Sequence, residues 1–167
     1  MYVQNFENLW IDENDYYRDS RNWFICYTDG SCKGNHQHGR RYSGSGIVFG
    51  DHPRREISQP CHPKDPSTNQ HAELKAALIA IRHARKFNLG RLQIRTDSKF
   101  LISIVPHFKN GGNLVPHLAV IIEEIIDLMD FVDVDFIYIP AHINEQGNER
   151  ADFLAKKAAD IHRYYFE

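Results

Sequence analysis

Two aspartates follow strand-like segments of the sequence in the same local setting. Asp29 comes after Thr28 at the end of the run "FICYTDG", and Asp97 comes after Thr96 at the end of "LQIRTDS". We expect both strands to end there, and functional sites of open α/β sheets gather at the carboxyl ends of strands. An isolated Asp-Gly pair after a strand is usually only a turn. The pair of aspartates therefore indicates a site only if further acids reach the same place.

Two more carboxylates lie on helix-like segments that are rich in alanine. Glu73 borders an alanine stripe that includes Ala76, and Asp152 lies between Ala151 and Ala155. A carboxylate at the edge of a buried helix face is costly to desolvate unless it finds a cation or hydrogen-bond donors. Either acid alone could be a solvated helix residue. Together with the two strand-end aspartates, they favour one shared site.

A cluster of four carboxylates needs a counter-charge, because the acids would repel one another and could not all ionise at neutral pH. Oxygen ligands without Cys or His select Mg²⁺, which Mn²⁺ can replace, rather than zinc. Two such ions about 4 Å apart suit the hydrolysis of a phosphodiester. His142, in the loop-like run "PAHINEQGNERAD", could move a proton beside them. The sequence holds ten histidines, so spacing alone does not single this one out.

The segments that carry these residues alternate between strand and helix patterns. Strands are predicted at residues 23–28, 42–50, 55–60, 91–98 and 134–142, and helices at 67–90, 99–105, 115–132 and 148–165. Ser67 and Gln70 fit a capping box for the first helix, and Pro106 is expected to end the second. This order predicts an α/β fold with a five-stranded mixed sheet, antiparallel over its first three strands and flanked by helices.

One domain is expected to occupy residues 22–162. An acidic, loosely ordered arm over residues 1–21 precedes it, and a short tail over residues 163–167 follows. No apolar run approaches the roughly 18 residues of a membrane helix, and the acidic N-terminus resembles neither a secretory signal nor a transit peptide. The three cysteines lack metal-type spacing. We therefore expect a monomer inside the cell, cytoplasmic or nuclear, without a membrane partner.

The charge of the chain is unevenly distributed. The formal net charge is −2, but acids are concentrated in residues 1–22 and 123–135. The rest of the chain therefore has a surplus of bases, which suits a nucleic-acid partner. A solvated surface of mixed charge is the alternative that charge patterning leaves open.

Four segments in series resemble the type 1 ribonuclease H family. They are "YTDGSCKGN", "STNQHAELKAALIAI", "IRTDSKFLI" and "IPAHINEQGNERADFLAKKA", and the resemblance covers about residues 22–160. It implies an endonuclease that cleaves the RNA strand of RNA–DNA hybrids and leaves 5′-phosphate and 3′-hydroxyl ends. It also implies that His142 assists turnover and that four acids hold two Mg²⁺ ions, namely Asp29, Glu73, Asp97 and Asp152.

The same resemblance assigns contacts to each strand of the hybrid. Contacts to RNA 2′-hydroxyls and base edges are implied for Asn35, Asn69 and Gln70, although the last two also suit helix capping. Contacts to the DNA strand are implied for Thr68, Phe100, Phe108 and Asn113. The chain departs from the family pattern at Pro66, where many members have arginine, and at Phe108, which replaces a tryptophan. Some members insert a segment rich in Lys and Trp, the basic handle, before the second long helix, and in this chain that segment is shortened to "FKNGGN". These departures are expected to affect the affinity for substrate and the contact with the DNA strand. They do not involve the metal site.

Other classes of protein fit the sequence less well. An EF-hand is excluded because "DGSCKGNHQHGR" ends in Arg40 rather than Glu. A haloacid-type phosphatase would need a second acid where Ser31 stands. Two alternatives stay open: a hybrid-binding module that does not cleave, and a ribonuclease H domain derived from a reverse transcriptase. The complete set of acids favours the enzyme over the module, and the His142 loop favours a cellular enzyme.

Overall fold

The computed structural model describes residues 9–34, 40–141 and 145–166. In this part of the chain the elements are, in order, β1 Trp10–Ile11, β2 Tyr17–Arg18, β3 Phe24–Lys33, β4 Tyr42–Val48, η2 Pro53–Arg55, β5 Glu56–Pro60, α1 Asn69–Lys86, β6 Arg91–Thr96, α2 Lys99–Lys109, α3 Pro116–Leu128, β7 Asp133–Tyr138 and α4 Gln146–Phe166.

Strand β3 lies at the centre of the sheet. It pairs antiparallel with β4, which in turn pairs antiparallel with β5. It also pairs parallel with β6, and β6 pairs parallel with β7. These five strands form the predicted mixed sheet, and the expected change from an antiparallel start to strand–helix alternation is confirmed. The short strands β1 and β2 extend the sheet to seven strands.

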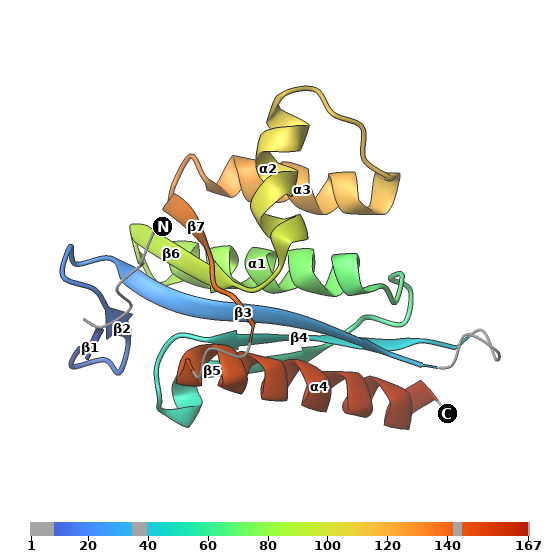
Figure 1. Ribbon diagram of the computed structural model, residues 1–167, viewed down its shortest axis with the longest axis horizontal. Coiled ribbons are helices and arrows are strands. Elements are labelled where there is room, and N and C mark those ends of the chain that lie inside the picture. The colour runs from blue at the N-terminus through green and yellow to red at the C-terminus, as the bar shows by residue number, and fades with distance from the viewer. Residues whose placement is uncertain (1–8, 35–39, 142–144, 167) are drawn as a thin grey trace.

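Helices cover both faces of the sheet (Figure 1). Helix α1 packs on β3 and β4, with α2 and α3 beyond it, whereas α4 lies along the opposite face over β3, β4 and β5. The larger hydrophobic core lies on the α1 side and includes Leu74 and Ile94. A smaller core on the α4 side includes Ile25 and Leu154. The strand ends therefore lie between helices of two layers, which can each contribute side chains to one site.

Glycines in β4 allow α4 to approach the sheet closely. A Cβ at Gly44 would lie 2.3 Å from the Ala158 Cβ, and a Cβ at Gly46 would lie 2.2 Å from the Ala151 carbonyl oxygen. The alanines of α4 and the glycines of β4 thus form one tight contact. Glycines within a strand mark either a bulge or a close backbone approach, and those of β4 serve the close approach.

The N-terminal residues differ from the loosely ordered arm that the sequence predicts. Over residues 9–21 the chain forms β1 and β2 and buries Tyr16, whose exposed fraction is 5%. The Tyr16 ring meets Phe24 and Phe49 edge to face. Asp12 is also buried, and its Oδ1 accepts hydrogen bonds from the backbone N–H groups of Asn14 and Tyr16. One of the acids that made this segment look solvated is therefore part of its folding.

Three helix boundaries also differ from the sequence-based expectation. Helix α2 continues through Pro106 to Lys109, because packing of its apolar side on the core outweighs the loss of one backbone donor. Helix α1 is capped by Thr68 rather than by Ser67, with Thr68 Oγ1 accepting from the His71 backbone N–H at 3.1 Å. Helix α4 extends to Phe166 and so includes most of the expected tail. Among the described residues, no helix is long and apolar enough to cross a membrane.

Candidate active site

Asp29 lies inside a strand rather than at its end, which corrects the sequence-based prediction. Strand β3 stays paired with β4 as far as Lys33, but its parallel pairing with β6 stops at Tyr27 and Arg95. Beyond that point β6 ends at Thr96 and turns into α2. Asp29 therefore lies beside the carboxyl end of β6, just beyond the last residues that pair between the two strands.

Asp97 occupies the turn between β6 and α2. The Ser98 backbone N–H donates to Thr96 Oγ1 at 3.0 Å, and Ser98 Oγ caps α2 by accepting from the Leu101 N–H at 3.1 Å. These two hydrogen bonds close the turn around Asp97. The aspartate is half-buried and lies at the strand end that the sequence predicts.

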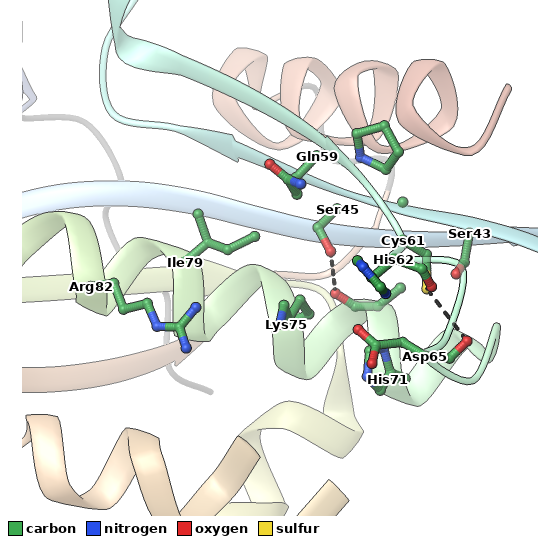
Figure 2. Close-up of a pocket in the computed structure, with 13 residues that line it drawn as sticks. Ser43, Ser45, Gln59, Cys61, His62, Asp65, His71, Lys75, Ile79 and Arg82 are labelled. Atoms are coloured by element: carbon green, nitrogen blue, oxygen red, sulfur yellow. Dashed lines mark hydrogen bonds between the residues drawn. The ribbon is translucent and has the colours of Figure 1, made fainter. Parts of the chain in front are cut away.

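Glu73 reaches the same place from α1, and two contacts hold this helix against the sheet. Ser45 of β4 donates its hydroxyl to the Ala72 carbonyl oxygen at 2.8 Å (Figure 2). Gly30 lies directly against the helix, since a Cβ there would be 2.4 Å from the Glu73 backbone nitrogen. Glu73 itself is 5% exposed. The Asp-Gly pair of β3 therefore serves close packing, and its glycine makes room for the third acid.

Asp29, Glu73 and Asp97 form one acidic cluster, in which a carboxylate oxygen from each lies within 4.8 Å of the others. Burial, together with repulsion from the neighbouring acids, raises the pKa of both Asp29 and Glu73. Glu73 Oε2 is buried and has no hydrogen-bond partner. An unpartnered buried oxygen among repelling carboxylates fits a divalent cation, which supplies the missing partner and the counter-charge. The donor set is the one that Mg²⁺ or Mn²⁺ prefers.

Asp152 lies beside this cluster but is not one of the three acids that meet within 4.8 Å. After burial and the charge of Asp97, the neighbouring carboxyl group of Asp152 also raises the pKa of Asp29. Its Oδ2 accepts a hydrogen bond from Lys156 Nζ at 2.7 Å, and its side chain is 43% exposed. Asp152 is thus an accessible acid on the α4 side of the cluster.

The structure describes most of the predicted substrate-contact residues. Asn69 and Gln70 are exposed at the start of α1, one turn before Glu73, and Thr68 is the cap of that helix. Phe100 and Phe108 are partly buried and pack against the main core. Asn113 is exposed, and its carbonyl oxygen lies 3.1 Å from His107 Nε2. His142 and Asn35 lie outside the described residues.

A cavity of about 300 Å³ lies between α1 and the strands β4 and β5 (Figure 2). Its lining includes Ser43, Lys75 and the buried His71. Burial lowers the pKa of His71, so its imidazole is neutral at pH 7. None of the acids in the cluster lines this cavity.

The sequence-based prediction does not single out two polar side chains on the strands beside the acids, Ser45 and Arg95. Both lie within predicted strands, at residues 42–50 and 91–98, and carry no further prediction. Arg95 is in fact buried, and its Nη1 donates to Glu145 Oε1 at 2.9 Å, just before α4. An arginine between Ile94 and Thr96 in a central parallel strand was the available signal, because such strands are otherwise apolar.

Comparison with known proteins identifies the family. A family model described as RNase H matches residues 21–160, and this range contains the acidic cluster and Asp152. The chain belongs to the RNase H family. This agrees with the resemblance of the four sequence segments and with the fold.

This RNase H family member is similar to several individual proteins of known sequence or structure. It is 32% identical to human ribonuclease H1 over 146 residues, which cover 81% of this chain and 49% of the human protein. It is 27% identical to LC11-RNase H1 in a crystal structure with an RNA/DNA hybrid, with a TM-score of 0.61 and coverage of 82% and 96%. A foamy viral protease–reverse transcriptase in complex with dsDNA is 28% identical, with a TM-score of 0.63 and coverage of 81% and 92%.

The curated relatives are longer than the region that matches this chain. The chain spans about half the length of the curated relatives from human, mouse, rat and fission yeast that it matches. The match therefore concerns the RNase H part of those proteins.

Proposed function

We propose that this chain is an endonuclease that hydrolyses the RNA strand of RNA–DNA hybrids. The observation that carries the proposal is the cluster of Asp29, Glu73 and Asp97, with its unpartnered Glu73 Oε2, in a chain of the RNase H family. A related enzyme, LC11-RNase H1, has been crystallised with an RNA/DNA hybrid, which supports the choice of substrate.

We propose further that the acids hold two Mg²⁺ ions when substrate is bound, with Mn²⁺ as a substitute. Asp29, Glu73 and Asp97 would hold the metal at the centre, and the accessible Asp152 would complete the ligand set from α4. The ions would supply counter-charge for the acids and Lewis-acid activation of the attacking water and the leaving oxygen. With water forming the new bond to phosphorus and the ribose 3′-oxygen leaving, the reaction would give 5′-phosphate and 3′-hydroxyl ends.

The residues around the acids would distinguish the two strands. Asn69 and Gln70, exposed one turn before Glu73, suit hydrogen bonds to ribose 2′-hydroxyls, and Asn35 would join them. Thr68 can cap α1 through its lone pair and still donate its proton to a DNA phosphate. Asn113, together with the partly exposed rings of Phe100 and Phe108, would complete the DNA contact. His142 would assist proton transfer or product release.

The alternatives named above share this site. A domain derived from a reverse transcriptase would perform the same chemistry. The similarity to a foamy viral enzyme is therefore compatible with the proposed reaction. A binding module that does not cleave would not need a complete set of acids. We also propose a monomer acting inside the cell, which suits the free thiols of Cys26, Cys32 and Cys61.

The test is cleavage of an end-labelled RNA–DNA hybrid with and without Mg²⁺, beside the same RNA as a single strand and as an RNA duplex. We expect cutting of the hybrid alone and only with metal. Asp97→Asn removes one metal-binding charge with little change in shape, so it should abolish cleavage while circular dichroism shows an intact fold. Full activity of this variant would refute the metal assignment. Binding of the hybrid without cleavage in Mg²⁺ or Mn²⁺ would support the binding module instead.

A further inference from the structure

A largely buried polar network joins β3, which carries Asp29, to the strand that leads into Asp97 and to the residue before the helix that carries Asp152. Arg95 Nη1 donates to Glu145 Oε1 at 2.9 Å and lies 3.1 Å from the Tyr27 hydroxyl. The Tyr27 hydroxyl in turn donates to the same Glu145 oxygen. Arg95 Nε donates to Gln93 Oε1 at 2.9 Å, which orients the guanidinium. The network is largely buried, because the side chains of Arg95 and Glu145 are only 7% and 14% exposed.

The positions of these residues along the chain link the network to the acids. Tyr27 and Arg95 face each other as register partners of β3 and β6, and each stands two residues before an acid of the cluster. Glu145 precedes α4, and its carbonyl oxygen accepts a hydrogen bond from the Glu149 N–H at 3.1 Å. Asp152 follows two helical turns later. One side-chain network therefore connects the β3 and β6 acids to the start of the helix that carries the fourth acid.

The start of α4 also rests on this network by packing. A Cβ at Gly147 would lie 2.2 Å from the Tyr27 ring, so the first turn of α4 lies directly on the tyrosine. The other polar contacts of this part of α4 reach β5: the exposed Arg150 pairs with Glu56, and the Leu154 carbonyl oxygen accepts from Ser58 Oγ at 2.7 Å. Those contacts hold α4 to the edge of the sheet. The Arg95 network holds it to the strands that carry the acids.

A buried ion pair is a poor way to gain stability, because desolvation offsets most of the attraction. What such a pair does supply is a defined geometry, since separating two largely buried charges loses their attraction without restoring their full hydration. An apolar contact between β6 and α4 would tolerate sliding. A bifurcated contact of one Glu145 oxygen with Arg95 and Tyr27 does not.

We propose that Arg95 and Glu145 are positioning residues, which together with Tyr27 hold the start of α4 at the height where Asp152 can join the acidic cluster. The inference rests on the proposed metal-dependent function, because it concerns how the fourth acid reaches the metal site. Neither residue would contact substrate or metal. They act through Asp152.

The test compares Glu145→Gln with the double variant Arg95→Gln/Glu145→Gln, which removes both charges of the pair and serves if the single variant folds poorly. Glu124→Gln is the matched control, because it breaks the exposed ion pair of Arg82 and Glu124 between α1 and α3. In folded Glu145→Gln we expect kcat to fall about 10-fold or more and the Mg²⁺ concentration for half-maximal rate to rise, as when supporting residues of metal ligands are removed. The KM for hybrid should change little, and Glu124→Gln should behave as wild type.

A second readout does not need activity. Substoichiometric Mn²⁺ added to ¹⁵N-labelled protein broadens the amide signals near the cluster, and we compare the broadening at Asp152 with that at Gly30. In wild type both signals should broaden. In Glu145→Gln and in the double variant, the broadening at Asp152 should weaken relative to that at Gly30.

The outcomes separate this proposal from the proposed function. An unchanged ratio of broadening with kcat and Mg²⁺ dependence near wild type in both variants would overturn the positioning role and leave the network a structural feature. If the wild-type protein binds Mn²⁺ but cleaves no hybrid, the proposed function fails. The ratio of broadening then still decides whether the network holds Asp152 at the cluster.

Discussion

Gly30 lies directly against the backbone of Glu73, so close that a Cβ on Gly30 would be 2.4 Å from the Glu73 nitrogen. The glycine that follows Asp29 therefore sets the distance between β3 and α1, and with it the distance between two acids of the cluster. A backbone atom cannot move aside as a flexible side chain can. This contact connects the sequence "TDG" to the geometry of the site.

Gly30→Ala is expected to force α1 away from β3. Overpacking of this kind costs about 1–3 kcal/mol of unfolding free energy, and the displaced Glu73 should reduce Mg²⁺-dependent cleavage far more than the lost stability explains. Thermal unfolding and hybrid cleavage, measured below the unfolding transition, check both effects. Gly90→Ala is the control, because no atom lies within 4 Å of a Cβ there. Wild-type activity in Gly30→Ala would contradict the assigned contact.

The metal-free protein should lose stability as the pH rises. Burial and the neighbouring acids raise the pKa of Asp29 from 3.8 to about 8 and that of Glu73 from 4.5 to about 9. At these two groups the folded state therefore binds more protons than the unfolded state. Below about pH 6.5 buried histidines with a lowered pKa, such as His83, act in the opposite direction, so the free energy of unfolding is expected to fall from about pH 7 to about pH 9. Urea unfolding in EDTA across this range measures the slope.

Two variants and the addition of Mg²⁺ test which groups cause the dependence of stability on pH. Glu73→Gln removes one of the two groups and should flatten the slope and raise the stability at pH 8. Glu124→Gln removes an exposed carboxylate and should leave the slope unchanged. Mg²⁺ added at pH 8 should restore stability, because a ligand that binds only the folded state stabilises it. A wild-type slope in Glu73→Gln would show that another group is responsible.

Thr68 is expected to have two separable roles. Its hydroxyl caps α1, so Thr68→Ala should lower the free energy of unfolding by about 1 kcal/mol. If the same hydroxyl also donates to a DNA phosphate, the KM for hybrid should rise several-fold while kcat changes less. Thr68→Ser keeps the hydroxyl and should preserve both quantities. Loss of stability in Thr68→Ala with an unchanged KM would leave Thr68 a helix cap only.

Much of this fold follows from local patterns. Alternating apolar residues mark the strands, alanine spacing marks α1 and α4, and the repeated Thr-Asp after "FICY" and "LQIR" marks two of the acids. Such patterns depend on the period of a strand or helix, which short stretches of sequence carry in full. The same segments resemble the RNase H family, to which the chain belongs.

Other features depend on contacts between distant residues. Nothing local indicates that Tyr16 folds the N-terminal segment onto Phe24 and Phe49, or that α2 continues through Pro106 because its apolar side is buried. The position of Asp29 within β3 likewise depends on where a different strand, β6, stops pairing. Register between strands is set by the packing of the whole sheet and not by either strand alone.

By itself, the sequence determined the α/β class, the order of the elements and the types of residue that could hold a divalent cation. Only the tertiary structure decided that three acids meet within 4.8 Å while Asp152 lies beside them, and that Arg95 is paired with Glu145. The physical reason is that propensity and periodicity act over a few residues. The approach of two carboxylates depends instead on the packing of helices and strands that are far apart in the sequence.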